Sequence, residues 1–346
     1  MKKVAVIGAG PSGIAAIKNF IDEGFDVMAF ERCSGVGGNW RFNDPSGHSS
    51  VFETTHIISS KYTSFYEDYP LPDDASDYPS HKELLSYFDG YAEHFNIKKN
   101  IKFGTEVLSC KQSANDGWLI KYRHLNSNEE ITLQFDALVV CNGHHHVPRY
   151  PHYKGEFKGE YLHSHDYKRA APFENKRVLV IGGGNSACDV AVETSRISQE
   201  TSLSWRRGYH LVPKFMYGLP ADVFAKRSRW IPQFLRIPFM KYMLERYQGK
   251  NEDIGLPKVT SKMLATHPTV NSDLYNAIRH GKVKPRPDIE SFSENTVNFV
   301  DGTSAEYDVV IACTGFKIKH AFFEKDLINF EEGPVPLLHR MLPADI

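Results

Sequence analysis

The chain has 346 residues, of which 41% are hydrophobic and 24% charged, so it is long enough for two domains and able to bury a sizeable core. Its 41 basic and 42 acidic side chains nearly cancel, which argues against the basic surface typical of nucleic-acid-binding proteins. No run of 18 apolar residues occurs, so we expect no membrane-spanning helix, and the apolar run at residues 4–7 is too short for a signal peptide.

The chain opens with a strand, a glycine-rich turn and a helix. Residues 4–7 are apolar, residues 8–13 read G-x-G-x-x-G, and a helical pattern follows over residues 14–23. A second strand pattern at residues 25–30 ends at Glu31, 18 positions after the last glycine of the turn. At that place a carboxylate can accept hydrogen bonds from both ribose hydroxyls of a dinucleotide. This order of elements is the context that the dinucleotide-binding fingerprint requires.

Each glycine of this turn has its own steric role. Gly8 permits the tight turn, Gly10 lets a pyrophosphate approach the backbone, and Gly13 lets the helix pack on the strand. The phosphates would meet free N–H groups at the helix N-terminus, where Pro11 and Ser12 lie.

The same unit recurs later in the chain. Residues 177–181 are a strand pattern, residues 182–187 read G-x-G-x-x-A, a helix runs to about residue 195, and residues 201–205 form the next strand. The two copies also close alike, because residues 136–143 resemble residues 308–315. The distance from opening to closing glycine is 135 residues in the first copy (8 to 143) and 133 in the second (182 to 315).

Shorter alternating segments at residues 118–122 and 296–300 predict a small β-meander in each copy, with a hairpin turn at Asp301-Gly302. The predicted fold is therefore α/β, with two Rossmann-like dinucleotide-binding domains, each containing a parallel sheet and a small β-meander.

The ends of the two second strands differ, and this difference predicts the nucleotides. The second copy has Trp205-Arg206-Arg207 where an NAD site would carry an acidic residue, and two guanidinium groups suit the 2′-phosphate of NADPH. The alternative is that the two arginines are a solvated surface pair. The residues expected to hold NADPH are Gly182, Gly184, Asn185, Ser186, Arg206 and Arg207.

The first copy, with Glu31, suits either NAD or FAD. A second glycine-rich turn follows at residues 35–40 and ends in Gly38-Asn39-Trp40. Such a turn can approach an extended cofactor beyond its adenosine, which favours FAD. The residues expected to hold FAD are Gly8, Gly10, Pro11, Ser12, Gly13, Glu31, Gly38, Asn39 and Trp40.

Between the two glycine turns, residues 157–168 resemble the flavin-containing monooxygenase fingerprint F-x-G-x-x-x-H-x-x-x-Y-K. Its residues here are Phe157, Gly159, His163, Tyr167 and Lys168. The segments 38–40, 184–186, 267–271 and 313–316 are also similar to that family, and the ending Tyr167-Lys168 resembles its N- and S-oxygenating branch rather than the Baeyer–Villiger branch.

The resemblance implies an enzyme in which NADPH reduces FAD and a flavin hydroperoxide oxygenates an amine nitrogen or a sulfide sulfur. Because the flavin carries the chemistry, no protein side chain is assigned as catalytic. The expected domains are an FAD-binding domain at residues 1–168, an NADPH-binding domain at 169–316 with a helical insert at about 209–266, and a return to the FAD domain at 317–346. His163 is expected either to contact nucleotide phosphate or to make a structural hydrogen bond.

The chain departs from the family pattern in two places. The family commonly has Asn a few residues before a Ser-Lys pair, and here Ile58 precedes Ser60-Lys61. This favours one alternative, an uncoupled NADPH oxidase-type flavoprotein that releases peroxide. A non-catalytic nucleotide-binding redox sensor is a separate alternative. The family also continues beyond residue 346 into another strand, so we expect a fragment or a shortened member.

The five cysteines lie far apart and form no C-x-x-C pair; they are Cys33, Cys110, Cys141, Cys188 and Cys313. This pattern argues against a disulfide framework and structural zinc, and we expect a cytoplasmic protein without a metal site. It also argues against a pyridine nucleotide–disulfide reductase, which needs two redox-active cysteines near its flavin.

Two further segments carry expectations. The run His144-His145-His146 is expected to line the flavin side as a loop rather than to bind metal, because consecutive residues point in different directions. The apolar segment 230–240 predicts a helical insert packed on the NADPH domain, with a lid over the substrate or a surface touching membrane or a partner as alternatives. A homodimer is left open.

Overall fold

The computed structural model describes the chain except residues 115, 264–267, 325–326, 328–336, 339–340 and 344–346. It consists of two compact units. Unit 1 comprises Met1–Val51, His81–Val147 and Phe316–Ile346, and unit 2 comprises Phe52–Ser80 and Pro148–Gly315. These units differ from the predicted ranges 1–168, 169–316 and 317–346 in three places, since residues 52–80 and 148–168 belong to unit 2 and residue 316 belongs to unit 1.

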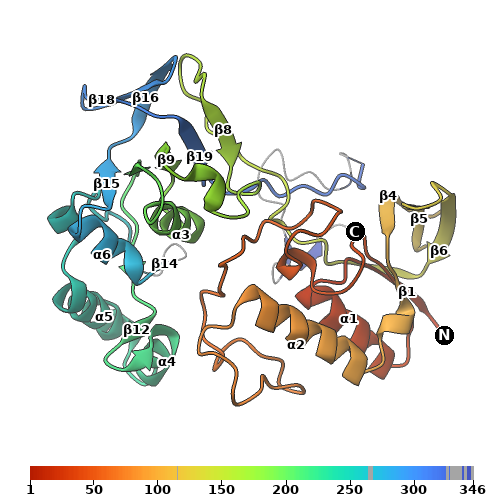
Figure 1. Cartoon of the computed structure of the whole chain (residues 1–346). Helices are drawn as coiled ribbons and strands as arrows, with labels where there is room; N and C mark the ends of the chain where they lie inside the picture. The colour runs from red at the N-terminus through yellow and green to blue at the C-terminus, as the bar shows by residue number, and fades with distance from the viewer. Residues whose placement is uncertain (115, 264–267, 325–326, 328–336, 339–340, 344–346) are drawn as a thin grey trace. The chain divides into compact units, whose positions relative to one another are not determined.

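Unit 1, which contains the β1, α1 and α2 labelled in Figure 1, is built on a parallel sheet of four strands in the order β3-β2-β1-β7. Its strands and helices are β1 (Lys3–Ile7), α1 (Pro11–Asp22), β2 (Asp26–Phe30), a 3-10 turn at Gly38–Trp40, α2 (His81–His94), a 3-10 turn at Lys98–Asn100, β3 (Ile101–Lys102) and β7 (Ala137–Val140). Helix α1 begins three residues earlier than predicted, because Pro11 fits the first helical turn, where its missing N–H leaves no hydrogen bond unmade.

A three-stranded antiparallel meander lies between β3 and β7 in the sequence of unit 1. It consists of β4 (Thr105–Gln112), β5 (Trp118–His124) and β6 (Glu130–Phe135). Its inward side chains form one core with Ile7 and Phe30 of the parallel sheet. Near the C-terminal end, β20 (Leu337–Leu338) pairs with β21 (Leu342–Pro343).

Unit 2 is built on a parallel sheet of five strands in the order β15-β10-β9-β19-β8. Its elements are β8 (Glu160–His163), a 3-10 turn at Ala171–Phe173, β9 (Arg177–Ile181), α3 (Asn185–Thr194), β10 (Glu200–Ser204), α6 (Asp273–Arg279), β15 (Val283–Arg286) and β19 (Val309–Ala312). The second meander consists of β16 (Ile289–Ser293), β17 (Thr296–Phe299) and β18 (Ser304–Glu306). The predicted turn at Asp301-Gly302 joins β17 to β18, and Gly302 adopts a φ of 82° there.

In its described residues, the insert between β10 and α6 carries short strands and the helices α4 and α5. These elements are β11 (Leu211–Val212), β12 (Phe215–Met216), β13 (Leu219–Pro220), α4 (Ala221–Arg227), α5 (Gln233–Gln248), a 3-10 turn at Asn251–Ile254 and β14 (Thr269–Val270). Leu244 of α5 packs with Met216 and Met263, so the insert has a small core of its own.

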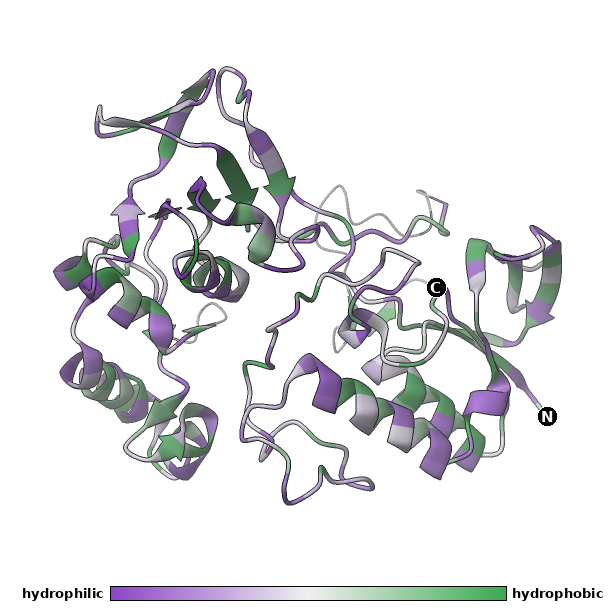
Figure 2. Cartoon of the chain, viewed as in Figure 1, coloured by the Kyte–Doolittle hydropathy of each residue, from purple (hydrophilic) through white to green (hydrophobic). Residues whose placement is uncertain are grey.

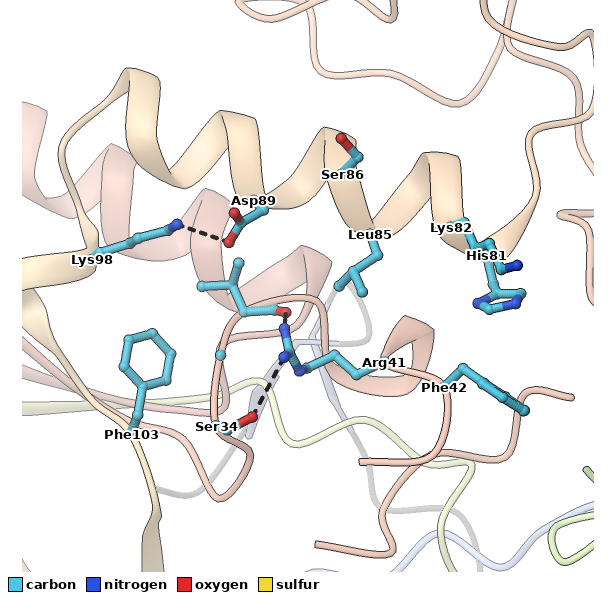
Figure 3. A pocket seen from close by; sticks show the side chains of 12 residues that line it. Ser34, Arg41, Phe42, His81, Lys82, Leu85, Ser86, Asp89, Lys98 and Phe103 are labelled. Carbon is cyan, nitrogen blue, oxygen red and sulfur yellow. Dashed lines mark hydrogen bonds and ion pairs between the residues drawn. The ribbon is translucent and has the colours of Figure 1, made fainter. Parts of the chain in front are cut away.

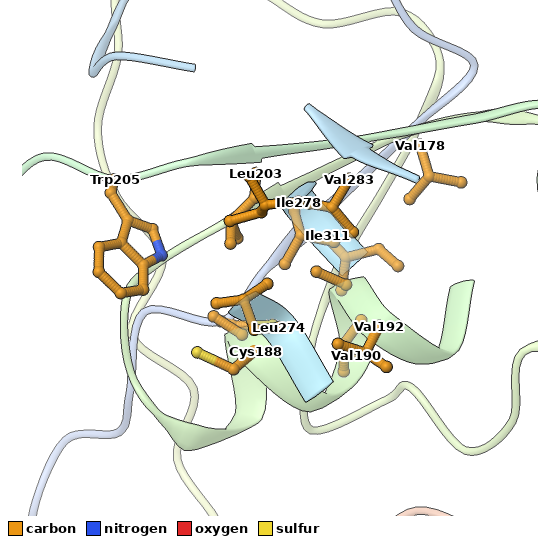
Figure 4. Close-up of a cluster of buried hydrophobic side chains, with 14 of the residues drawn as sticks. Val178, Cys188, Val190, Val192, Leu203, Trp205, Leu274, Ile278, Val283 and Ile311 are labelled. Carbon is orange, nitrogen blue, oxygen red and sulfur yellow. The ribbon is translucent and has the colours of Figure 1, made fainter. Parts of the chain in front are cut away.

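The core of unit 2 lies between its sheet and the helices α3 and α6. Figure 4 shows Leu203, Val283 and Ile311 of the sheet facing Cys188 of α3 and Leu274 of α6, with Trp205 at the edge of this cluster. The strand β19 is fully buried and is green, hence hydrophobic, in Figure 2. A strand buried on both faces explains why residues 309–312 read as an uninterrupted apolar run.

The hydrogen bonds confirm the predicted duplication residue by residue. The N–H of Asp136 donates to the carbonyl of Lys3 at 2.9 Å, and the N–H of Asp308 donates to that of Arg177 at 2.9 Å. Each aspartate also accepts a hydrogen bond from the N–H of its partner, at 2.6 Å in the first copy and 2.8 Å in the second. Two segments of the same length and chemistry have therefore folded into the same local geometry.

Candidate nucleotide-binding sites

The first glycine turn leaves no room for side chains at two of its positions. Gly8 has a φ of 97°, and a Cβ built on it would lie 2.5 Å from the carbonyl oxygen of Cys141 in the strand-end segment after β7. A Cβ on Gly13 would overlap the carbonyl oxygen of Gly8. The turn and the end of β7 therefore touch backbone to backbone, which brings the N-terminus of α1 to the carboxyl edge of the sheet.

We expect Gly8→Ala to lower the free energy of unfolding by ~3 kcal/mol, because it adds a steric overlap to an unfavourable backbone conformation. Gly24→Ala is the matched control, since Gly24 also has a positive φ of 81° but a Cβ there would meet no atom within 4 Å. That control should cost only ~1 kcal/mol. Urea unfolding followed by circular dichroism measures both values, and equal losses would contradict the close approach at Gly8.

Glu31 follows β2 and is buried, with 6% of its surface exposed. One carboxylate oxygen accepts the N–H of Ala9 in the glycine turn at 2.6 Å, and the other accepts the N–H of Cys33 at 2.7 Å. Each carboxylate oxygen has a further lone pair, so both remain able to accept a hydrogen bond from a ligand hydroxyl. Glu31 therefore links the glycine turn to the segment after β2 while facing the cavity described below.

The glycine-rich turn at residues 35–40 packs directly on the glycine turn at residues 8–13. The N–H of Gly37 donates to the carbonyl of Ala9 at 3.0 Å, and a Cβ on Gly38 would lie 3.0 Å from the Cα of Gly10. Arg41 supports this turn from its other side by donating to the carbonyl of Val36 at 3.1 Å. Figure 3 shows Arg41 at a cavity of about 580 Å³, which is separate from the one described in the next paragraph. Lys98 and Asp89, which also line this smaller cavity, form an ion pair at 2.8 Å.

A cavity of about 790 Å³ lies at the carboxyl edge of the unit 1 sheet. The sequence-predicted residues that line it are Gly8, Gly10, Pro11, Ser12, Glu31, Gly38 and Asn39. Gly13 and Trp40 are not among its lining residues, and Gly13 instead holds α1 against the turn. The volume and the lining by both glycine-rich turns and Glu31 suit a cofactor with a phosphate at the helix N-terminus and a ribose at Glu31.

Several lining residues were missed by the sequence reasoning. They come from β4, from the segment after β7 and from the C-terminal segment of unit 1, and they are Thr105, Glu106, Val107, Asn142, Gly143, Ile318, Lys319, His320, Ala321 and Phe322. The resemblance between residues 136–143 and 308–315 was visible in the sequence. It did not show that the end of β7 borders the site.

Histidines gather along this cavity. His144, His145 and His146 line it together with His48, whose ring stacks on that of His146 with centroids 4.8 Å apart. Burial, assisted by the two neighbouring imidazoles, lowers the pKa of His145 to about 4, so this ring is neutral at physiological pH. The position of this run as a loop after β7 is as predicted. In the part of the chain that the structure describes, no group of three or more metal-ligating side chains is placed to hold an ion.

The second glycine turn of the repeat has the same geometry as the first. Gly182 has a φ of 135°, its N–H donates to Ser204 at 3.0 Å, and a Cβ on it would overlap the carbonyl oxygen of Cys313. Gly184 and Ser186 are exposed, and a Cβ on Gly184 would meet no atom within 4 Å. The side-chain oxygen of Asn185 accepts the N–H of Val270 at 2.7 Å, which orients this side chain within unit 2.

Both arginines after β10 are exposed. The guanidinium of Arg207 lies over the ring of Tyr209, 5.3 Å from its centroid, and donates to its hydroxyl at 3.0 Å. Trp205, at the position that corresponds to Glu31, is buried and packs edge-on against the same ring at 5.8 Å. The aromatic pair thus replaces the carboxylate of the first copy and holds one guanidinium at the end of the strand.

Comparison with known proteins decides the family. The protein-family model described as flavin-binding monooxygenase-like matches residues 1–346. The chain belongs to the flavin-binding monooxygenase-like family. The family places it among the flavin-dependent monooxygenases, which are oxidoreductases.

Two curated relatives resemble the whole chain. Dimethylaniline monooxygenase (N-oxide-forming) 2 of Oryctolagus cuniculus is 36% identical over 361 residues, covering 100% of this chain and 67% of the relative. Flavin-containing monooxygenase 2 of Homo sapiens is 35% identical over 362 residues, with the same coverage. The chain therefore spans about two thirds of the length of these relatives.

Solved structures of other proteins share the fold. The flavin-containing monooxygenase from Stenotrophomonas maltophilia is 21% identical, has a TM-score of 0.72, and matches 97% of this chain and 86% of its own. S-allyl-L-cysteine S-oxygenase from Allium sativum is 22% identical, with a TM-score of 0.68, over 94% of this chain and 65% of its own. The predicted fold class of two Rossmann-like units is thereby confirmed.

The family fingerprint lies within unit 2 and is largely buried. Phe157 packs on Phe292 with centroids 5.7 Å apart, and a Cβ on Gly159 would lie 2.6 Å from the carbonyl oxygen of Asp308. Tyr167 is 1% exposed and stacks on Phe173 at 5.6 Å. These three residues therefore contribute to the packing within unit 2.

The two remaining fingerprint residues make structural hydrogen bonds. His163 is fully buried and accepts the N–H of His165 at 3.1 Å, and burial lowers its pKa. Lys168 donates to the carbonyl of His165 at 2.8 Å, and burial lowers its pKa as well. Two roles were expected for His163. The structure shows the structural hydrogen bond, and a contact with nucleotide phosphate stays a prediction.

Two further parts of the family pattern are Ile58 and residues 267–271. Ile58, at the position of the usual asparagine, lies in the segment 52–80 of unit 2 and is partly exposed. Of the similar segment 267–271, His267 lies outside the described residues.

All five cysteines are free, and burial raises the pKa of Cys33, Cys110 and Cys313 to about 12, so these thiols are protonated. None of the described helices has both the length and the apolar character to cross a bilayer.

Proposed function

We propose that this protein is an NADPH- and O2-dependent flavin monooxygenase that oxygenates soft nucleophiles, an amine nitrogen or a sulfide sulfur. One observation carries the proposal. Each unit has one cradle, made of a glycine turn, the helix after it and the end of the next strand, and the two cradles have the same backbone geometry. The strand of the first cradle ends in the carboxylate of Glu31 beside a cavity of about 790 Å³, whereas the strand of the second ends in Arg206-Arg207. The printed name of the rabbit relative, an N-oxide-forming dimethylaniline monooxygenase, supports an amine substrate.

The residues of unit 1 fit FAD. The glycine turn at the N-terminus of α1 offers backbone N–H groups for the pyrophosphate, and a Cβ on Gly38 would crowd Gly10 and narrow the cavity between the two turns. Glu31 would accept the ribose hydroxyls. When bound, the flavin supplies the hydride acceptor and the site of oxygen activation.

The residues of unit 2 fit NADPH. Gly182, Gly184 and Ser186 line the turn at the start of α3, where the dinucleotide pyrophosphate would lie. Arg206 and Arg207 would bind the 2′-phosphate through charge-assisted hydrogen bonds. In the overall reaction one atom of O2 enters the substrate and the other leaves as water, with NADPH and a proton supplying the electrons and hydrogen.

The test is an oxygen-electrode assay with purified protein, NADPH and a panel of tertiary amines and thioethers that includes N,N-dimethylaniline. We expect substrate to accelerate oxygen uptake, and mass spectrometry to find N-oxide or S-oxide in amounts equal to the NADPH consumed. Absence of NADPH-dependent oxygen uptake by the yellow, flavin-loaded protein would refute the proposal.

Ile58 supports one alternative, an uncoupled NADPH oxidase that reduces O2 to hydrogen peroxide. Its aliphatic side chain offers no hydrogen bond where the family commonly has asparagine. If the alternative holds, peroxide will account for most of the NADPH consumed, and Ile58→Asn will lower that share at least twofold. A peroxide share that is small in the wild type excludes the oxidase.

A redox sensor without catalysis is the other alternative, and a colourless purified protein that binds NADPH tightly would favour it. We also propose, from the dispersed cysteines, a cytoplasmic location, which fractionation of the producing cells tests. The oligomeric state is tested by light scattering.

A further inference from the structure

Three consecutive residues of unit 2 form hydrogen bonds with the glycine turn at residues 182–187 and with α3. They form the latch, defined here as Thr269, Val270 and Asn271, which follows the helical insert along the chain. The latch is itself fixed, because Leu211 and Val212 of β11 pair in parallel with Thr269 and Val270 of β14. Thr269 and Asn271 are buried, with 2% and 4% of their surfaces exposed.

Each latch residue bonds one residue of the turn or of α3. The hydroxyl of Thr269 donates to the carbonyl of Gly183 at 2.8 Å, in a buried contact. The N–H of Val270 donates to the side chain of Asn185 at 2.7 Å. The side-chain amide of Asn271 donates to the carboxylate of Asp189 at 2.6 Å. The bonded residues lie in the turn and on successive turns of the helix, so the latch fixes both.

The bond to Gly183 sets the direction of a peptide group. In a trans peptide the C=O of one residue and the N–H of the next point in opposite directions, and the described chain has no cis peptide bond. Because the carbonyl of Gly183 points at Thr269, the N–H of Gly184 points away from it. Gly184 is the residue that precedes the first turn of α3, and its surroundings are open.

The first cradle fixes the equivalent peptide with a different donor. Ala9 occupies the position of Gly183, and its carbonyl accepts the N–H of Gly37 from the second glycine-rich turn at 3.0 Å. The corresponding N–H, that of Gly10, is thereby directed as in the second cradle. The duplicated turns share this restraint on the middle peptide, although its source differs: a backbone N–H in unit 1, and a threonine hydroxyl 86 residues along the chain in unit 2.

We propose that Thr269 is a positioning residue for the pyrophosphate of NADP(H): its hydroxyl holds the Gly183–Gly184 peptide so that the N–H of Gly184 is aimed at a phosphate oxygen. This inference rests on the proposed NADPH site. Without the hydroxyl, the buried Gly183 carbonyl loses its partner, and the peptide gains freedom to turn the N–H away from the phosphate.

The experiment compares Thr269→Val with Thr269→Ser in the full chain. Valine keeps the shape and removes the donor, whereas serine keeps the hydroxyl. Thr194→Val is the matched control, because the buried hydroxyl of Thr194 donates to the carbonyl of Val190 within α3 at 2.7 Å, away from the turn. Calorimetric titration measures the affinity for two probes, NADP+ and adenosine 2′-monophosphate, which carries the 2′-phosphate but no pyrophosphate. Bound flavin is read from the visible absorbance.

We expect Thr269→Val to bind NADP+ about tenfold to a hundredfold more weakly than the wild type, the loss of one aimed hydrogen bond to a charged group. Its affinity for adenosine 2′-monophosphate, its flavin content and the NADP+ affinity of Thr194→Val should stay within about twofold of the wild type. Thr269→Ser should recover most of the NADP+ affinity.

Unchanged NADP+ affinity in Thr269→Val would overturn the inference while leaving the proposed function intact. An equal loss for both probes, or a serine variant as weak as the valine variant, would also overturn it, because either result indicates general disruption of unit 2. If the wild-type protein binds neither probe, the proposed NADPH site itself fails, and the role of Thr269 fails with it.

Discussion

Replacing Glu31 with glutamine is expected to yield a purified protein that has lost most of its flavin. The carboxylate accepts two buried backbone N–H groups, those of Ala9 and Cys33, at 2.6 and 2.7 Å. The amide of glutamine offers one oxygen and one NH2 group, so at least one of these N–H groups would face a donor instead of an acceptor. A hydrogen bond to the ribose would be lost from the same atom.

The size of this effect follows from the number of bonds changed. An unsatisfied buried N–H costs ~1–3 kcal/mol, and the lost charge-assisted bond to ligand adds a similar amount, so FAD affinity should fall ~100-fold or more. The ratio of absorbance at 450 nm to that at 280 nm reports flavin content. Glu23→Gln, the same change at an exposed position after α1, should retain full flavin. A Glu31→Gln protein with stoichiometric FAD would show that Glu31 does not hold the cofactor.

Removing both arginines after β10 is expected to abolish the preference for NADPH over NADH. Arg206 and Arg207 are exposed, and the ring of Tyr209 orients the second of them. Each charge-assisted bond to the 2′-phosphate contributes ~1.5–3 kcal/mol, so the Arg206→Ala/Arg207→Ala protein should raise the KM for NADPH ~30-fold or more. The KM for NADH should change little, because NADH lacks the phosphate.

The chain offers a close control for this experiment. Arg279 in α6 is also exposed, donates to the hydroxyl of Tyr275 at 2.9 Å, and lies over that ring at 5.2 Å from its centroid. Arg279→Ala removes the same charge and the same aromatic contact elsewhere on unit 2, and it should leave both KM values unchanged. Steady-state rates with each nucleotide give the ratio, and a ratio unaffected by the double substitution would mean that the arginines are only a solvated pair.

The sequence was sufficient for the parts of the fold that local chemistry determines. The strand–turn–helix units, the hairpin at Asp301-Gly302 and the meanders all follow from periodicity and turn residues, which act over a few positions. The roles expected of Gly8 and Gly13 match their close backbone contacts. Helix starts were the weakest point, because Pro11 and Asn185 begin their helices inside the glycine motifs.

Long-range contacts lay beyond the reach of the sequence. The division of the chain into units depends on where residues 52–80 pack, and Thr54 donates to Glu193 in α3 at 3.1 Å, 139 residues away. The contact of Thr269 with Gly183 was equally invisible, since no periodicity connects a threonine after an insert to a turn before it. The same reason hid Thr105 and Phe322 from the list of cavity residues.

The route of the backbone between the two units has a practical consequence. The polypeptide changes unit after residues 51, 80, 147 and 315, so four separate connections join them. Neither half can be excised as one continuous piece by shortening a gene, and a protease that cuts one connection leaves three others intact. Any attempt to study a single nucleotide-binding half in isolation would therefore require rejoining its separate segments with designed linkers.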